Sequence, residues 1–257
     1  MTSWSTPPTQ GLLAPGRWSK GLRAALEAMV VREAPEPGGP PLLATFDWDN
    51  TCIRGDLAEG VLETLDEREG TRRFATYLSL IEEVGELEAY VFCTTTLAGR
   101  TEPALRALAL EVWEERLADG RIAERPEMPD LISALERHGW EVWIVSAAAE
   151  ILVQVAAERY GLDPDRVIGV RLAVGKDQML QDRVVGPFPH REGKIAVIEQ
   201  RIGRHPAFAT GNADSDIEML EAARFRLVIN NGSTELREIA NQGGWWVQTG
   251  WDLPEND

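Results

Sequence analysis

The chain has 257 residues, 44% of them hydrophobic, and a net charge of −16 from 26 basic and 42 acidic side chains. A chain of this length can bury a sizeable core in one large domain or two smaller ones. No apolar run approaches the roughly 18 residues of a membrane span, and an acidic surface repels nucleic acid and anionic membranes. We therefore expect neither a nucleic-acid partner nor a membrane partner.

Targeting and redox signals are weak in this sequence. The first eight residues lack the basic start and apolar core of a signal peptide. The chain has only two cysteines, Cys52 and Cys93, which do not make a disulfide framework. A cytoplasmic location is the resulting expectation.

An extension of residues 1–41 precedes the first strand. Residues 1–18 contain prolines and scattered tryptophans, which indicates irregular structure, and the apolar spacing within 19–32 predicts one helix. Residues 35–41 read Pro-Glu-Pro-Gly-Gly-Pro-Pro, a linker that neither a helix nor a strand can cross. The apolar run that follows predicts a strand over 42–47.

Residues 56–125 have a helical pattern throughout, with glycines between the segments. This pattern predicts an all-helical cap inserted after the first strand. We expect the cap helices at 57–68, 71–84, 86–98 and 103–119.

Strand and helix patterns alternate from residue 126 onward. The expected strands are 140–146, 167–174, 206–210, 225–229 and 245–248. The expected helices are 129–138, 148–160, 192–203, 214–223 and 233–241. This alternation predicts an α/β fold, in which a Rossmann-like parallel sheet and its helices form a three-layer core of residues 42–55 and 126–257.

Polar clusters lie at or just after the ends of these apolar segments. They are Asp47-Trp48-Asp49-Asn50-Thr51, then Ser146-Ala147, then His190-Arg-Glu-Gly-Lys194, and finally the turn Gly211-Asn212-Ala213-Asp214-Ser215-Asp216. Ligands of open α/β sheets bind outside the carboxyl ends of the strands. We therefore expect the four clusters to converge on one site.

The residue types in these clusters suit phosphoryl transfer. Carboxylates two residues apart can hold Mg²⁺, and a carboxylate can attack phosphorus once a metal and a cation screen the substrate's charge. A second carboxylate can move the protons, while a serine and a lysine hold the phosphoryl oxygens. Each signal alone also fits turn or helix-cap chemistry, including Ser146 and Asp214 as caps. The four together, in this order, favour a catalytic site.

These motifs resemble the haloacid dehalogenase-like hydrolase superfamily, and within it the phosphoserine phosphatase-like branch, which includes phosphorylcholine phosphatases. The resemblance covers about residues 42–248, and the helical insertion stands where that branch has its cap domain. It implies that Asp47 is a nucleophile that forms an aspartyl-phosphate. It also implies that Asp49 is the general acid/base, that Ser146 binds the phosphoryl group, and that Lys194 pairs with that group and with Asp47.

The resemblance further implies a Mg²⁺ site made by Asp47, Asp49 through its backbone carbonyl, Asn212 and Asp216. The family usually has aspartate where this chain has Asn212, so Asp214 is an alternative direct ligand. The expected substrate contacts near the reacting group are Thr51, Ala147 and Asn212.

Asp56 stands at the spacing where phosphoserine phosphatases place an acid against the substrate's amino group. The resemblance therefore suggests a cationic substrate, which Asp56, Glu59 and Trp48 could attract by charge and by cation–π contact. Asp56 is also a good N-cap for the helix that follows it. Arg54 or Arg100 could instead bind a carboxylate.

We expect a Mg²⁺-dependent phosphatase that acts on a small phosphorylated metabolite, with amine-bearing esters such as phosphoserine and phosphorylcholine as candidates. A phosphotransferase or mutase would use the same residues. A metal-free dehalogenase is a further alternative, as is a catalytically weakened binding protein, which Asn212 suggests. His190 could face the site because it lies near Lys194. The sequence does not indicate the oligomeric state.

Overall fold

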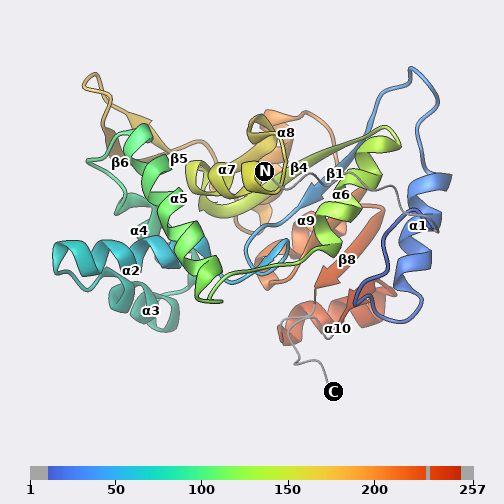
Figure 1. Cartoon of the computed structure of the whole chain (residues 1–257), viewed down its shortest axis with the longest axis horizontal. Helices are drawn as coiled ribbons and strands as arrows, with labels where there is room; N and C mark the ends of the chain where they lie inside the picture. Colours follow the sequence, from blue (N-terminus) through green and yellow to red (C-terminus); the bar gives the residue numbers. More distant parts are fainter. Residues whose placement is uncertain (1–10, 230–231, 250–257) are drawn as a thin grey trace.

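A computed structural model describes residues 11–229 and 232–249 of the chain. Residues 1–10 of the expected irregular segment and residues 250–257 of the expected core lie outside this range. Figure 1 shows a twisted sheet with packed helices and, beside it, a separate group of helices. Over the described ranges, every helix is too short or too polar to cross a bilayer.

Within the described residues, the main sheet has seven strands in the order β6-β5-β4-β1-β7-β8-β9. Their bounds are β1 Leu42–Phe46, β4 Trp140–Ala149, β5 Val167–Val174, β6 Leu180–Val185, β7 Phe208–Gly211, β8 Phe225–Ile229 and β9 Trp246–Gln248. The central strand β1 is parallel to both of its neighbours, β4 and β7. All residues of β1 except the first are buried, as expected for a strand that is covered on both faces of the sheet.

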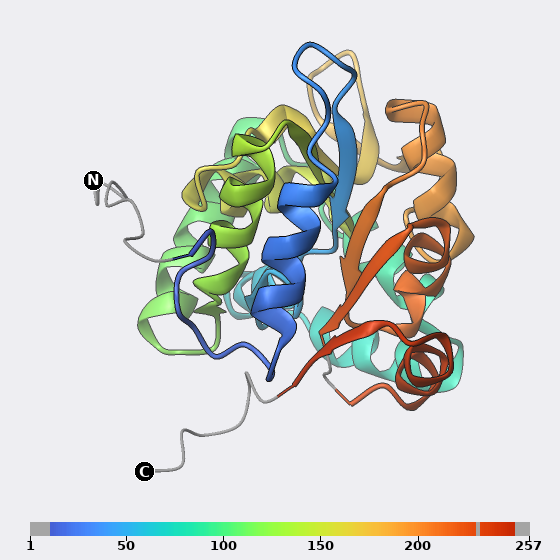
Figure 2. The same ribbon diagram turned by 90° about the vertical axis from the view of Figure 1, so that its right-hand side faces the viewer.

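Helices cover both faces of this sheet, as the edge-on view in Figure 2 shows. Helices α1 (Leu22–Arg32), α6 (Glu127–Arg137) and α7 (Glu150–Arg159) pack in one apolar cluster with Ala44 and Phe46. Helices α8 (Glu192–Arg201), α9 (Ile217–Ala222) and α10 (Thr234–Gly243) pack in a second cluster with Leu43. Successive side chains of a strand point to opposite faces, so β1 contributes to both clusters. The predicted three-layer α/β core is confirmed.

The inserted helices are α2 (Leu57–Glu69), α3 (Arg73–Glu83), α4 (Glu86–Thr95) and α5 (Glu102–Ala118). They lie beside the carboxyl edge of the sheet in Figure 1, and α5 contacts α7 of the core. A short antiparallel pair, β2 (Ile53–Arg54) and β3 (Ala123–Glu124), joins the two places where the chain enters and leaves these helices. Strands of two residues are too short to show alternation in a sequence, so this pair was not predicted.

The sheet departs from the parallel arrangement at one edge. Strand β6 runs antiparallel to β5, in a region, 175–191, where no element was predicted. Most of its side chains are exposed, so the sequence there has no apolar pattern to recognise. The 140–146 strand also continues to Ala149, with a register shift after Val145 that leaves Ser146 in an irregular part of the strand.

Candidate active site

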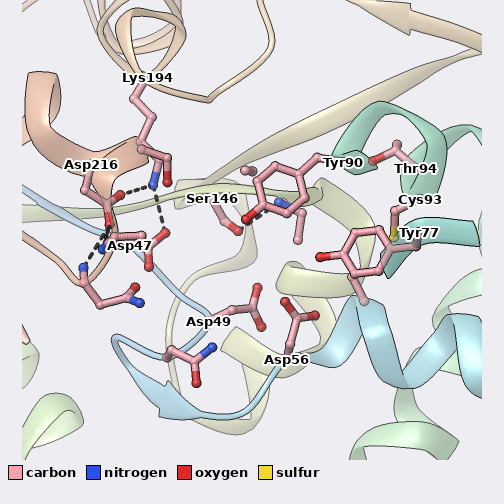
Figure 3. A pocket seen from close by; sticks show the side chains of 17 residues that line it. Asp47, Asp49, Asp56, Tyr77, Tyr90, Cys93, Thr94, Ser146, Lys194 and Asp216 are labelled. Atoms are coloured by element: carbon pink, nitrogen blue, oxygen red, sulfur yellow. Dashed lines mark hydrogen bonds and ion pairs between the residues drawn. The ribbon is translucent and has the colours of Figure 1, made fainter. Parts of the chain in front are cut away.

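The register of the three central strands brings the polar clusters together. Phe46 of β1 pairs with Ile144 of β4 on one side and with Thr210 of β7 on the other. Asp47 follows one residue later, and Ser146 and Asn212 follow their own strands' paired residues by two. Together with Lys194 of α8 these side chains line one cavity of about 100 Å³ at the carboxyl edge of the sheet (Figure 3). The convergence expected from the sequence is therefore present.

Lys194 is the fixed cation of this cavity. Its Nζ donates to Asp47 Oδ1 at 2.8 Å, to Asp216 Oδ1 at 2.5 Å and to the Val145 carbonyl at 2.9 Å. An ammonium has three protons, so these three partners use all of them. Burial acts to lower the pKa of Lys194, but the charges of Asp216 and Asp47 raise it above its ordinary value. Lys194 therefore stays charged and holds Asp47 in place.

Asp47 is buried, and both of its carboxylate oxygens are held. Lys194 binds Oδ1, and the Thr51 hydroxyl donates to Oδ2 at 2.7 Å. Burial and the charge of Asp216 raise the pKa of Asp47 to about 6, while Lys194 and Thr51 act to lower it. At neutral pH the side chain is therefore a carboxylate with a fixed orientation, as a nucleophile requires.

Thr51 has a different place from the one expected. It is fully buried, does not line the cavity, and lies within 2.8 Å of Asn212 Oδ1 as well as binding Asp47. A substrate cannot reach a side chain in this position. We assign Thr51 to orienting Asp47 rather than to contacting substrate. Arg125, which the sequence did not point to, supports the same loop by donating to the Asn50 and Thr51 carbonyls.

Asp216 holds the acidic turn together. Its Oδ1 accepts from Lys194, and its Oδ2 accepts from the backbone N–H groups of Asn212 at 2.9 Å and Ala213 at 3.0 Å. Gly211 is required beneath it, because a Cβ there would lie 2.5 Å from the Asp216 carboxyl carbon. In this arrangement both carboxylate oxygens of Asp216 already bind protein groups.

Asp214 points away from the cavity. Its Oδ1 accepts from the Ser233 hydroxyl and, at 3.2 Å, from the backbone N–H of Leu236 at the start of α10. Asn212, in contrast, lines the cavity. Of the two alternatives that the sequence left open for a direct metal ligand, the geometry favours Asn212.

The donor set suits a hard divalent cation. Among the described residues, no three carboxylate, thiol or imidazole side chains form a ready metal cage. The cavity nevertheless presents the oxygens of Asp47, Asp49 and Asn212, and Mg²⁺ binds such oxygen ligands. Burial, followed by repulsion from neighbouring carboxylates, raises the pKa values of Asp47 and Asp49. A cation bound there would relieve that repulsion.

Ser146 and Ala147 line the cavity beside Lys194. The Ser146 hydroxyl accepts from the Ala148 N–H at 3.1 Å, whereas the N-cap of α7 is Ala149, which makes no side-chain cap. Ser146 is therefore not the cap of α7 that its sequence position allowed. Its hydroxyl can donate to an anion in the cavity.

Asp49 and Asp56 lie farther from the sheet (Figure 3). Asp49 Oδ1 accepts from the Leu57 N–H at 3.2 Å, and burial and the charges of Asp56 and Asp47 raise its pKa well above the ordinary value. Asp56 is the N-cap of α2, accepting from the Glu59 N–H at 2.9 Å, and it also lines the cavity. The N-cap role of Asp56 is therefore confirmed, while its contact with a cationic substrate stays a prediction.

The cap contributes a wall that the sequence did not reveal. Tyr77 of α3 lines the cavity together with Tyr90, Cys93 and Thr94 of α4. These residues belong to no recognisable sequence motif. The sequence could have pointed to them only through the polar and aromatic side chains of the helices expected to form the cap. Trp48, which the sequence allowed as a cation–π partner, is fully buried against Tyr160, with ring centroids 5.3 Å apart, and does not line the cavity.

Three other candidates lie outside the cavity. Arg54 donates to the Gly120 carbonyl, and Arg100 donates to the Thr96 carbonyl and pairs with Glu69. His190 packs edge-on against Tyr90, 5.8 Å between centroids, and lies 3.3 Å from Glu86. None of the three lines the cavity.

Comparison with known proteins agrees with this geometry. No curated protein sequence matches the chain. A functionally unknown protein from Anaerococcus prevotii DSM 20548 superposes with a TM-score of 0.76 at 16% identity, over 93% of this chain and 94% of that one. A protein of unknown function from Bordetella pertussis Tohama I has a TM-score of 0.64 at 25% identity, over 81% and 98%.

A third similar structure is a phosphoserine phosphohydrolase-like protein from Francisella tularensis subsp. tularensis SCHU S4, with a TM-score of 0.56 at 16% identity, over 80% of this chain and 94% of that one. At this identity the likeness concerns the fold. The sequence profile of the haloacid dehalogenase-like hydrolases matches residues 44–221, from β1 to α9, and so spans all four polar clusters. The chain therefore belongs to the haloacid dehalogenase-like hydrolase family.

Proposed function

We propose that this chain is a Mg²⁺-dependent phosphatase that hydrolyses a small phosphomonoester through an aspartyl-phosphate on Asp47. The observation that carries the proposal is the Asp47 carboxylate, fixed between Lys194 and Thr51 in a cavity that also holds the Asp49 carboxyl. A nucleophile and a proton-transfer group in one cavity are the minimum that two-step hydrolysis requires.

In the first step a carboxylate oxygen of Asp47 forms a bond to phosphorus, and the bond between phosphorus and the ester oxygen breaks. The departing oxygen takes a proton from Asp49, whose raised pKa favours the protonated form. The Ser146 hydroxyl donates to a transferring phosphoryl oxygen, where negative charge develops, and the positive charge of Lys194 stabilises that negative charge from its place beside Asp47. The alcohol is then released.

In the second step water attacks the aspartyl-phosphate. Asp49 takes a proton from that water, the bond between Asp47 and phosphorus breaks, and inorganic phosphate leaves. Asp47 and Asp49 return to their starting protonation states. The cap helices that roof the cavity would exclude bulk water while the first step proceeds.

Asp47, the Asp49 backbone carbonyl and Asn212 are the groups that would hold Mg²⁺, and Asp216 orients the turn that presents Asn212. The metal, when bound, supplies positive charge that screens the phosphoryl group. Lys194 adds the second positive charge that an anionic substrate requires in a cavity lined by carboxylates.

The direct test is phosphate release from a panel of phosphomonoesters with Mg²⁺, comparing wild type with Asp47→Asn. We expect the substitution to lower turnover at least about a thousandfold, because an amide is not a nucleophile toward phosphorus. Acid-quenched wild type should carry a phosphoryl group on the peptide that contains Asp47. Asp182→Asn, an exposed aspartate on β6, is the matched control and should retain full activity.

Two results would overturn the proposal. Wild-type phosphatase activity in folded Asp47→Asn would remove the nucleophile from the scheme. Product formation only in the presence of an acceptor alcohol, with no free phosphate, would identify a phosphotransferase instead.

A further inference from the structure

Tyr90 of the cap helix α4 lines the cavity together with Ser146 of the core. Figure 3 shows the hydroxyl end of Tyr90 directed toward Ser146, while Tyr77 lies farther along the wall that the cap supplies. Ser146 is one of the residues that we assign to the phosphoryl group. Tyr90 therefore reaches from the cap toward the part of the cavity where that group would lie.

The hydroxyls of the two tyrosines in this wall differ in what they bind. The Tyr77 hydroxyl hydrogen-bonds to Glu59 of α2. Within the described residues, the Tyr90 hydroxyl has no hydrogen-bond partner, and the contacts of this side chain are those of its ring. Tyrosine hydroxyls that are largely shielded from solvent usually have a partner. The partner of the Tyr90 hydroxyl must therefore enter the cavity from outside, as water in the free protein and as substrate in the complex.

The ring of Tyr90 is held on two sides. His190, which precedes α8 of the core, packs edge-on against it at 5.8 Å between centroids, and the Tyr77 ring lies 6.3 Å away within the cap. His190 Nε2 is also 3.3 Å from Glu86 Oε2, one turn earlier on α4. These contacts fix the direction of the ring and leave its hydroxyl facing the cavity.

The charges around the hydroxyl make it a hydrogen-bond donor. Burial raises the pKa of Tyr90, and so do the charges of four carboxylates, which are Glu86, Asp56, Asp47 and Asp216. The hydroxyl therefore keeps its proton at neutral pH. Asp47 and Asp216 belong to the core, so their effect on Tyr90 agrees with a hydroxyl that lies near the reacting group.

The phosphoryl group needs donors that Lys194 cannot supply. All three protons of the Lys194 ammonium already bind protein oxygens. A transferring phosphoryl group spreads its negative charge over three oxygens, and the Ser146 hydroxyl can donate to one of them. A neutral donor on the opposite wall can bind a second phosphoryl oxygen.

We propose that Tyr90 binds the phosphoryl group from the cap, by donating a hydrogen bond from its hydroxyl to a phosphoryl oxygen opposite Ser146. The inference rests on the proposed phosphatase activity and adds a substrate-binding residue to that site. Because α4 carries Tyr90, complete binding of the phosphoryl group then depends on the cap as well as on the core.

The first test uses inorganic phosphate, which has no alcohol part. Calorimetric titration with Mg²⁺ present compares wild type with Tyr90→Phe, which keeps the ring and its packing. We expect phosphate to bind the variant at least about tenfold more weakly, because hydrogen bonds to charged groups are among the stronger ones. Equal affinities, or no measurable binding of phosphate to wild type, would overturn the inference.

Two further variants control for indirect effects. Tyr77→Phe removes the neighbouring hydroxyl, which binds Glu59, and should weaken phosphate binding far less than Tyr90→Phe does. Ser79→Ala removes an exposed hydroxyl of α3 and should keep wild-type affinity. Equal losses in Tyr77→Phe and Tyr90→Phe would overturn the assignment to Tyr90.

Stability separates a role in binding from a structural role. Tyr90→Phe removes no hydrogen bond within the described residues, so its melting temperature without ligand should equal that of wild type. A clear fall in the melting temperature, with phosphate affinity lowered to match, would show that the hydroxyl supports the fold and would overturn the inference.

Turnover shows which part of the ester the hydroxyl contacts. We expect Tyr90→Phe to lower kcat/KM by a similar factor for phenyl phosphate and for ethyl phosphate, because the two esters share the phosphoryl group. A loss confined to one ester would place the hydroxyl against the alcohol and overturn the inference. If neither ester is hydrolysed but phosphate binding still depends on the Tyr90 hydroxyl, the phosphatase proposal fails and the inference stands.

Discussion

The two ends of the cavity differ in the elements that supply their side chains and in the contacts that those side chains make. The sheet end is lined by Asp47, Ser146, Lys194 and the 212–216 turn, and the cap end is lined by Asp56, Tyr77, Tyr90, Cys93 and Thr94. The sheet end takes its side chains from strand termini and from α8, and these side chains bind one another through short contacts such as the three made by Lys194. The cap end takes its side chains from α2, α3 and α4, where Tyr77 and Tyr90 make mainly ring contacts. This difference teaches that the core holds the side chains of the sheet end in place by hydrogen bonds and ion pairs, whereas the inserted helices supply the side chains of the opposite wall.

The largest expected effect comes from removing the cation of the sheet end. Lys194→Met leaves Asp47 and Asp216 buried without their charge partner, and breaking a buried pair in this way costs about 3–5 kcal/mol. We expect that loss in the free energy of unfolding, measured with denaturant, together with loss of turnover. Lys176→Met, at an exposed lysine, should leave both quantities unchanged.

A second substitution sharpens this prediction. Lys194→Met combined with Asp216→Asn removes one of the two stranded carboxylates and should recover part of the stability. If Lys194→Met is as stable as wild type, the rigid sheet end that we describe does not exist.

Removal of the metal ion should lower turnover through its effect on the sheet end of the cavity. We expect a chelator to lower turnover at least about a hundredfold, because the sheet end then lacks the charge that screens the phosphoryl group. Asn212→Asp adds a carboxylate at the position that lines the cavity and should bind Mg²⁺ about tenfold more tightly, since ligand charge sets affinity at oxygen sites. Calorimetric Mg²⁺ titration measures this directly.

The control for metal affinity adds the same charge elsewhere. Asn241→Asp, exposed on α10, should leave Mg²⁺ affinity as it is in wild type. Equal affinities for Asn212→Asp and wild type would show that Asn212 is not a ligand.

A smaller effect is expected from Thr51. Thr51→Val keeps the side-chain shape but removes the hydroxyl that donates to Asp47 Oδ2, so kcat should fall about tenfold while KM changes little. The net loss of one hydrogen bond should cost about 1 kcal/mol of stability. Thr51→Ser, which restores the hydroxyl, should recover most of kcat. A change confined to KM would instead place Thr51 in contact with substrate.

The smallest effect concerns pH and the cap end. Burial and the charge of Asp56 raise the pKa of Glu59 from its ordinary value of 4.5 to about 7. Between these two pH values the folded chain holds more protons than the unfolded chain, so this group's contribution makes stability fall as pH rises and is most unfavourable above pH 7. Glu59→Gln should remove that contribution.

We expect Glu59→Gln to be more stable than wild type above pH 7, by less than about 1 kcal/mol because solvent screens a partly exposed group and the charge also favours the N-terminus of α2. The advantage should vanish below pH 4.5. Melting temperatures of both proteins across pH 4–8 measure it, with Glu83→Gln as the exposed control. A difference between the two proteins that does not vary with pH would contradict the prediction.

Most of the core could be predicted because each of its helices and strands has a recognisable pattern in its own sequence. Strands such as 167–174 and 225–229 were predicted with the bounds observed, since each is a mainly apolar run, interrupted by a single arginine, between turn residues. Strand β6 was missed because an edge strand with exposed side chains has no such run. Asp47, Ser146, Lys194 and Asn212 could be expected to converge, because parallel strands end at one edge of the sheet.

Contacts across the cap could not be predicted in this way. Trp48 adjoins Asp47 in sequence but turns into the core, and Tyr77 and Tyr90 lie far along the chain but line the cavity. The resemblance suggested that Thr51 contacts the substrate, but in the structure its hydroxyl donates to Asp47.

The sequence by itself determined the layered core and which polar residues gather at the carboxyl edge of the sheet, because hydrophobic periodicity and strand-end polarity are local properties. Only the tertiary structure decided which oxygens Lys194 binds, which residue of the acidic turn faces the cavity, and which cap side chains form its far wall. These depend on how helices separated from β1 along the chain pack over the sheet edge, and packing between distant segments leaves no periodic signal in either segment.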